Sequence, residues 1–239
     1  QPVPTYFERL AEEGVSSAVV SPARFAGSGL TGAALRGARH VPADTLEQRV
    51  SAALRELRAG TPVVYLYWSE IDHSGHAHGV ASDAWIGQVE QFDAGLAMLM
   101  RGLPSGVRAV LTADHGMINV EPDRIIDVAS TPALREGVRI VAGETRAAHV
   151  HAEEGRADEV EERWRETLGE SAWVLSRAQM PALIGEGSGA SVIGDLLVLA
   201  RGRGGVVDSR TQSAAAIAMP GIHGSVTPTE MRIPVVTLS

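Results

Sequence analysis

The sequence contains no cysteine among its 239 residues. This absence excludes disulfide bonds, thiolate metal ligands and a cysteine nucleophile. No apolar run approaches the ~18–20 residues that a membrane-spanning helix needs, and the N-terminus lacks the basic and then apolar pattern of a signal peptide. We therefore expect no membrane span and a cytoplasmic location. The chain also begins without methionine and enters a predicted helix at once, so we expect it to be part of a longer protein.

Blocks of consecutive basic residues are also missing, and the formal net charge is −8. Binding to a nucleic-acid backbone needs clustered basic side chains, so we expect no nucleic-acid binding. An acidic protein can still bind small phosphates when metal ions supply the local positive charge. The 44% of hydrophobic residues is ordinary for a globular protein and allows a sizeable core.

The apolar pattern of the first half alternates between helical and strand periods. It predicts helices over 4–13, 45–57 and 82–103, and strands over 15–20, 61–68 and 108–113. The Gly-rich stretch 27–37 and the polar stretch 69–79 are predicted to be loops. This alternation favours an α/β fold with a mostly parallel sheet flanked by helices.

The pattern changes near residue 125. Strands are predicted over 138–142, 147–152 and 172–175, a charged helix over 156–168, and a hairpin from 195–200 and 205–208 around Arg-Gly-Arg-Gly. We therefore predict a smaller α+β insertion or cap over 125–205. Residues 1–124 and 206–239 would form the core, which closes with a loop around His223 and a strand over 233–238.

Two polar clusters follow predicted strands of the core, where parallel sheets bind their ligands. Asp72 and His76 flank Gly75, and a glycine there would let the backbone fold tightly enough for both side chains to meet one ion. Asp114 and His115 end the next strand. Adjacent strand residues point to opposite faces, so both reach one metal only where the strand breaks. A solvated loop and a capping aspartate are the plainer alternatives.

The third candidate is His223, which lies between two glycines in Pro220–Ser225. Alone it is best interpreted as an ordinary loop histidine. Other polar residues carry weaker hypotheses. We favour a polar role over a metal-supporting one for His73 and His78, a surface or core role for the alternating His149 and His151, a turn role for Asp195, and solvation over phosphate binding for Arg24, while His40 has no evident partner.

Taken in order, the three pieces resemble a known family. Asp72-x-x-Gly-His76-x-x-Gly79, Thr112-Ala-Asp-His-Gly-Met117 and Gly221-Ile-His-Gly224 are similar to motifs of the type I phosphodiesterase/nucleotide pyrophosphatase family, within the alkaline phosphatase superfamily. The resemblance extends over the whole chain, including 142–149 and 227–234, and looks closest to bacterial members. It implies an alkaline-phosphatase-like fold.

The resemblance also implies two zinc ions bridged by the substrate phosphate. Asp72, His76 and His223 would hold the first zinc, and Asp114 and His115 would contribute to the second. In the family the second zinc also binds an Asp and a nucleophilic Thr or Ser from earlier in the chain. Neither motif is found here, so we expect no catalytic nucleophile in this chain, one retained zinc, and no activity of the chain alone.

The leading hypothesis is therefore a metal-dependent hydrolase of phosphodiester or nucleotide pyrophosphate bonds that acts through a covalent phospho-Thr or phospho-Ser intermediate. A phosphomonoesterase, a phosphonate hydrolase or a non-catalytic metal-binding fragment are the alternatives. We expect a small phosphoester or nucleotide as substrate, bound by residues that the sequence does not identify. The expected protein partner is the missing N-terminal half, another copy or a second chain.

Overall fold

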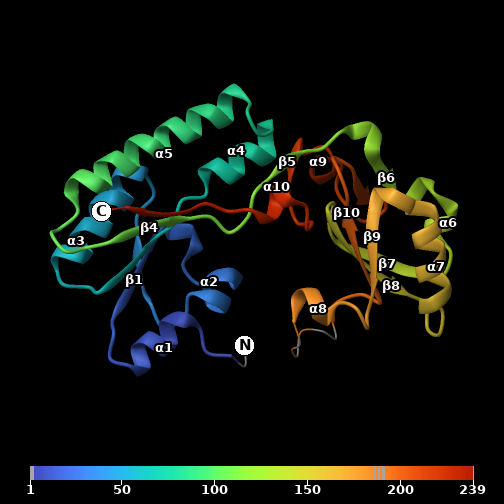
Figure 1. The fold of residues 1–239 in the computed structure, drawn as a ribbon, viewed down its shortest axis with the longest axis horizontal. Helices are drawn as coiled ribbons and strands as arrows, with labels where there is room; N and C mark the ends of the chain where they lie inside the picture. The colour runs from blue at the N-terminus through green and yellow to red at the C-terminus, as the bar shows by residue number, and fades with distance from the viewer. Residues whose placement is uncertain (1–2, 186, 188, 190–191, 239) are drawn as a thin grey trace. The chain divides into compact units, whose positions relative to one another are not determined.

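The structure is a computed structural model that describes residues 3–185, 187, 189 and 192–238 (Figure 1). The chain forms two compact units. The first comprises Gln1–Ile71, Ile86–Leu111 and Val235–Ser239, and the second comprises Asp72–Trp85 and Thr112–Pro234. No helix in the described residues is long and apolar enough to cross a membrane.

The first unit is built on parallel strands. Strand β1 (Ser17–Ser21) lies between β2 (Arg39–Pro42) and β3 (Val63–Leu66), and it is buried along its whole length. A separate pair joins β4 (Ala109–Thr112), whose last residue belongs to the second unit, to β13 (Val235–Leu238). The strand over 39–42 was not predicted from the sequence.

Helices α1 (Tyr6–Glu12), α3 (Leu46–Arg58) and α5 (Asp83–Gly102) occupy the stretches predicted to be helical. Both α1 and α3 begin with a capping box, in which a threonine side chain and the third helical residue satisfy each other's backbone N–H groups. Helix α5 passes so close to α3 that a methyl group added at Gly95 would lie 2.4 Å from the Leu46 side chain.

The cap of α3 supports a direct test. The Thr45 hydroxyl accepts a hydrogen bond from the Gln48 N–H, and the Gln48 side-chain oxygen accepts one from the Thr45 N–H. Replacing Thr45 with alanine is expected to lower the free energy of unfolding by about 1 kcal/mol, because it leaves one of these N–H groups without a side-chain acceptor. Thr45→Ser keeps the hydroxyl and should match the wild type in urea unfolding. Equal losses in the two variants would contradict this account.

Two stretches predicted to be loops are helical instead. Residues 27–37 contain α2 (Gly29–Ala34), because the Ser28 side chain caps the Thr31 N–H and offsets the helix-weakening effect of glycine. Residues 69–79 contain α4 (Glu70–His78). The glycine and polar residues there suggested a turn, but only Gly79, with φ of 86°, has a backbone that ends the helix.

The second unit contains an antiparallel sheet with strand order β7-β8-β10-β9. These strands are Val138–Glu144, Ala147–Ala152, Leu196–Ala200 and Ala172–Ser176, in the order of the sheet. Besides α4 and the start of α5, the described residues of this unit form five α-helices: α6 (Pro132–Arg135), α7 (Ala157–Leu168), α8 (Pro181–Ile184), α9 (Ala214–Ile217) and α10 (Pro228–Met231). The predicted helix over 156–168 and the strands over 138–142, 147–152 and 172–175 are confirmed.

The predicted hairpin of 195–200 and 205–208 is wrong. Both strands form, but β10 lies between β8 and β9, whereas β11 (Gly205–Val207) pairs in parallel with β6 (Ile125–Asp127). All five residues of β10 are buried, so this strand needs a neighbour on each side, and β8 and β9 provide them. Another short pair joins β12 (Gly221–Ile222) to β5 (Ile118–Asn119).

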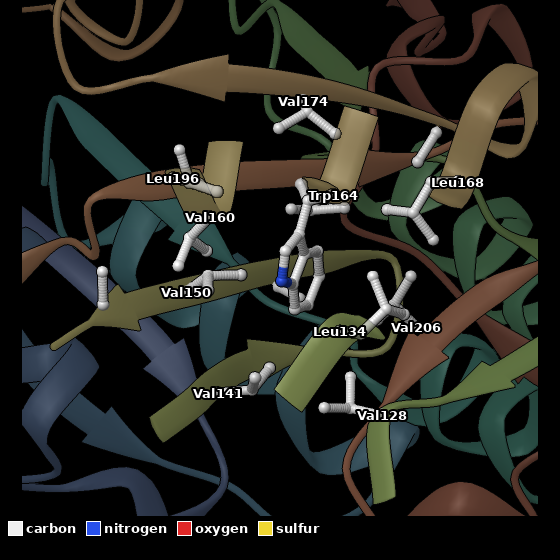
Figure 2. Close-up of a cluster of buried hydrophobic side chains, with 14 residues drawn as sticks. Val128, Leu134, Val141, Val150, Val160, Trp164, Leu168, Val174, Leu196 and Val206 are labelled. Atoms are coloured by element: carbon white, nitrogen blue, oxygen red, sulfur yellow. The ribbon is translucent and has the colours of Figure 1, made fainter. Parts of the chain in front are cut away.

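The core of the second unit surrounds Trp164, which is fully buried on α7 (Figure 2). Its neighbours come from the sheet and from α6 and α7; those labelled around it include Leu134, Val150, Val160, Leu168, Val174 and Leu196. The four-stranded sheet and α7 fall within the predicted 125–205 insertion. That boundary stays a prediction, because the compact unit also takes in residues on both sides of it.

Candidate metal centre

Helix α4 places Asp72 and His76 on one face. Residues four apart on a helix are neighbours on its surface, so the two side chains converge without the tight turn expected from the sequence. The Nε2 atom of His76 lies 3.5 Å from Oδ1 of Asp72. The spacing of the motif therefore brings these residues together through helical geometry.

His115 and His223 approach the same carboxylate oxygen from two other segments. The Nε2 atom of His115 lies 3.9 Å from Asp72 Oδ1, and that of His223 lies 3.8 Å from it. The two imidazole rings are stacked, with centroids 3.5 Å apart. Asp114 is more open: its side chain is 79% exposed, and its Oδ1 lies 3.7 Å from His115 Nε2. The structure thus brings four of the predicted ligands together, and Asp114 is placed beside the group by its neighbour in the chain, His115.

Within the described residues, one group of three or more side chains has the spacing of a metal site. It consists of Asp72, His76 and His223, each with a ligand atom within 4.8 Å of the others. This is the set that the family resemblance gives to the first zinc. The assignment of ligands to an ion stays a prediction.

Backbone carbonyl groups orient two of the three imidazoles. His76 Nδ1 lies 2.8 Å from the Gly221 carbonyl oxygen, and His115 Nδ1 lies 2.9 Å from that of Gly116. A carbonyl oxygen only accepts hydrogen bonds, so Nδ1 carries the proton in each ring. In the neutral ring this leaves a lone pair on Nε2, which is the nitrogen that faces Asp72.

The electrostatics of the site fit a cation. Asp72 Oδ1 is buried, and no hydrogen-bond partner contacts it in the described structure. A buried carboxylate oxygen without a partner is costly unless a positive charge or a donor satisfies it. Burial, followed by the neighbouring His115 ring, lowers the pKa of His223 below its usual value, which keeps the imidazole neutral and able to bind a metal. Mixed Asp and His ligands without thiolate suit a zinc-like ion.

Two glycines allow the ligand-bearing segments to approach each other. A methyl group added at Gly221 would lie 2.1 Å from the carbonyl oxygen of Gly75 in α4, and one added at Gly116 would lie 2.0 Å from that of Thr229. Only glycine fits such backbone contacts. From the sequence, Gly116 was interpreted only as a break after a strand and Gly221 only as part of a loop, so their role in close packing was missed.

Asn119 is a further residue that sequence reasoning missed. Its side chain accepts a hydrogen bond from the Val80 N–H at 2.7 Å and donates one to the Val80 carbonyl at 2.9 Å. It thereby holds the end of α4 against β5. The only signal was its place shortly after Asp114 and His115, which is too general to assign a role.

The other polar residues considered in the sequence analysis do not belong to the three-residue group of Asp72, His76 and His223. His73 and His78 are exposed on α4, and His149 and His151 are half-buried on the face of β8 opposite Ala148 and Val150. Burial, and then the charge of His151, lowers the pKa of His149. Of the remaining three, Arg24 is exposed over the Phe25 ring, Asp195 accepts a hydrogen bond from the Ala152 N–H, and His40 contacts the Ser21 hydroxyl at 2.8 Å.

A family model described as type I phosphodiesterase/nucleotide pyrophosphatase matches residues 6–225. No curated protein sequence matches the chain. The fold is similar to that of murine ectonucleotide pyrophosphatase/phosphodiesterase 5, as an inactive variant in complex with AMP, with a TM-score of 0.74 and 18% identity over 96% of this chain and 62% of that chain.

Two further structures have comparable similarity. The human counterpart gives a TM-score of 0.72 and 17% identity over 97% of this chain and 62% of that chain. Phosphonoacetate hydrolase from Sinorhizobium meliloti, in complex with phosphonoformate, gives a TM-score of 0.73 and 19% identity over 98% of this chain and 68% of that chain. The chain therefore spans 62% of the length of the murine and human proteins. The predicted α/β, alkaline-phosphatase-like fold is confirmed.

Proposed function

Because this chain belongs to the type I phosphodiesterase/nucleotide pyrophosphatase family, we propose that it supplies the metal-binding part of a hydrolase that cleaves phosphodiester or nucleotide pyrophosphate bonds. The observation that carries the proposal is the convergence of three imidazole Nε2 atoms, within 3.5 to 3.9 Å, on Oδ1 of Asp72, a buried oxygen with no hydrogen-bond partner among the described residues. Family membership supports a phosphoester substrate, and the side chains provide ligands for the cations that such chemistry uses.

In this proposal, Asp72, His76 and His223 hold the first zinc, and Asp114 and His115 contribute to a second. Two such ions, when bound, polarise the phosphoryl oxygens and stabilise the attacking and leaving oxygens of an in-line displacement. The carbonyl groups of Gly221 and Gly116 keep the imidazole protons on Nδ1, so that Nε2 is free to act as a ligand. The exposed carboxylate of Asp114 leaves the second position accessible to substrate.

The covalent step requires a nucleophile that we propose lies outside these 239 residues. Asp114 and His115 provide only two ligands, and the second site is then incomplete, because catalytic zinc in proteins usually has three protein ligands. The nucleophilic Thr or Ser and a further carboxylate would then come from a longer form of the protein or from a second chain. The chain alone is expected to bind metal without turnover.

A phosphonate hydrolase is the second candidate. The fold is similar to that of phosphonoacetate hydrolase in complex with phosphonoformate at a TM-score of 0.73, against 0.74 for the murine phosphodiesterase in complex with AMP. Both of those proteins bind a ligand with a tetrahedral phosphorus and anionic oxygens. The metal ligands of the present chain suit either substrate class, so the substrate assay has to distinguish them.

The full-length protein that contains this chain is expected to hydrolyse bis(4-nitrophenyl) phosphate at least about tenfold faster than 4-nitrophenyl phosphate, since a tenfold preference needs only ~1.4 kcal/mol of differential transition-state binding. A chelator should abolish this activity and zinc should restore it. Release of phosphate from phosphonoacetate, with no diester cleavage, would favour the second candidate. Unchanged diester hydrolysis in an Asp114→Asn variant would contradict the proposed site.

A further inference from the structure

Arg146 and Glu230 form an ion pair that is not part of the metal site described above. Both side chains are buried, at 0% and 1% exposure. Arg146 Nε donates to Glu230 Oε1 at 3.0 Å, and Arg146 Nη2 donates to Oε2 at 2.6 Å, so the contact is bidentate. The remaining terminal nitrogen, Nη1, donates to the Gly204 carbonyl oxygen at 2.6 Å. The guanidinium is therefore fixed on two sides.

The Glu230 carboxylate also holds the loop that carries His223. The Ser225 N–H donates to Oε1 at 3.0 Å, and the Thr227 hydroxyl donates to Oε2. Burial alone would raise the pKa of Glu230, but the hydrogen bonds from Arg146 and Thr227 outweigh it and lower the pKa below its usual value. The loop after His223 thus closes around a carboxylate that remains charged.

The backbone of Glu230 holds the other ligand-bearing loop. Its carbonyl oxygen accepts a hydrogen bond at 2.7 Å from the N–H of Gly116, the residue directly after His115. The lack of a side chain at Gly116 permits this approach. One residue therefore contacts both loops whose imidazoles, His115 and His223, stack at the metal site.

We propose that Arg146 and Glu230 are positioning residues that hold His115 and His223 at the spacing that metal binding requires. A buried ion pair by itself is a poor stabiliser, because the desolvation of two charges offsets their attraction. Its place at the junction of the two loops instead gives it an orienting role. Direct hydrogen-bond partners of metal ligands typically change metal affinity by about 10–100-fold, and Glu230 acts on the ligands through the backbone N–H groups of Gly116 and Ser225. The inference rests on the metal site proposed above.

Zinc titration calorimetry on the 239-residue chain tests the proposal. An Arg146→Met/Glu230→Leu double variant replaces the ion pair by apolar side chains. Its melting temperature should fall, because the Ser225 N–H, the Thr227 hydroxyl and the Gly204 carbonyl lose their partners, so zinc is titrated at a temperature where the variant is folded. Its zinc affinity should fall about 10–100-fold. Arg146→Lys keeps the charge but loses the bidentate contact, and Thr227→Val removes one hydroxyl donor. Both should lower the affinity less, in the same direction. The visible absorption of bound cobalt(II) should change with the ligand geometry.

Val174→Ala is the control, because it truncates the core of the same unit without touching either loop. At a temperature where it remains folded, it should bind zinc as the wild type does. Folded pair variants with wild-type affinity and cobalt spectrum would overturn the proposal, as would an equal loss in Val174→Ala. If the double variant does not fold, Arg146→Lys and Thr227→Val decide by the same criterion. Wild-type chain that binds no zinc would instead overturn the proposed metal site, and this inference with it.

Discussion

The His76→Ala variant is expected to bind zinc at least about 100-fold more weakly than the wild-type chain, because a direct ligand contributes more than an outer hydrogen-bond partner, whose loss costs about 10–100-fold. His76 Nε2 lies 3.5 Å from Asp72 Oδ1, and its Nδ1 is fixed by the Gly221 carbonyl. Removal of the ring leaves Asp72 and His223 as the remaining pair of the three-residue group. Titration calorimetry of the metal-free chain with zinc measures the change.

His78→Ala is the matched control for this experiment. His78 belongs to the same helix and has the same side chain, but it is exposed and is not one of the three converging residues. Its removal should leave zinc affinity at the wild-type value. If His78→Ala weakened binding as much as His76→Ala, the ion would be held by the polar cluster in general and the proposed ligand set would be wrong.

Gly221→Ala is expected to lower the free energy of unfolding by about 3 kcal/mol, the upper part of the usual range for overpacking. The new methyl group would lie 2.1 Å from the carbonyl oxygen of Gly75 and 2.8 Å from its carbonyl carbon, and both atoms belong to backbone, which cannot rotate away. The displacement would also move the carbonyl that orients His76 and the strand that leads to His223. Zinc affinity should therefore fall together with stability.

Gly87→Ala provides the opposite control, and urea unfolding measures the stability of both variants. Gly87 lies within α5, and a methyl group added there would meet no atom within 4 Å. Alanine favours the helix over glycine, so this variant should gain about 0.5–1 kcal/mol. If Gly221→Ala were as stable as the wild type, the backbone of β12 would be able to move away from Gly75, and the expected steric clash would be absent.

Local sequence signals predicted much of the secondary structure. The apolar spacing that predicted α3 and α5 depends on neighbours in sequence, and both helices are confirmed. Local signals failed where glycine was interpreted as a turn. Gly75 lies inside α4, and the helix places Asp72 and His76 on one face by their four-residue spacing. Glycine weakens a helix by only about 1 kcal/mol, so other contacts can outweigh that preference.

The candidate site was predictable in its residue types and order, and less so in its construction. Adjacent Asp114 and His115, and a histidine between two glycines at His223, are unusual enough to attract notice without a structure. Asn119 and the ion pair of Arg146 with Glu230 gave no such signal, because their roles depend on partners far away in the sequence. The hairpin error has the same origin: β10 and β11 are close in sequence, but each pairs with a more distant strand.

The sequence by itself determined which Asp and His side chains are available as candidate metal ligands, and this mixture of residue types is one that zinc accepts. It also determined the α/β alternation and the family to which the chain belongs. Only the tertiary structure decided that three imidazoles meet at one oxygen of Asp72 and that the ring protons lie on Nδ1. The physical reason is that periodicity and capping report interactions over a few residues. The meeting of α4, the Asp114–His115 loop and the His223 loop depends instead on backbone contacts at Gly116 and Gly221 between distant segments.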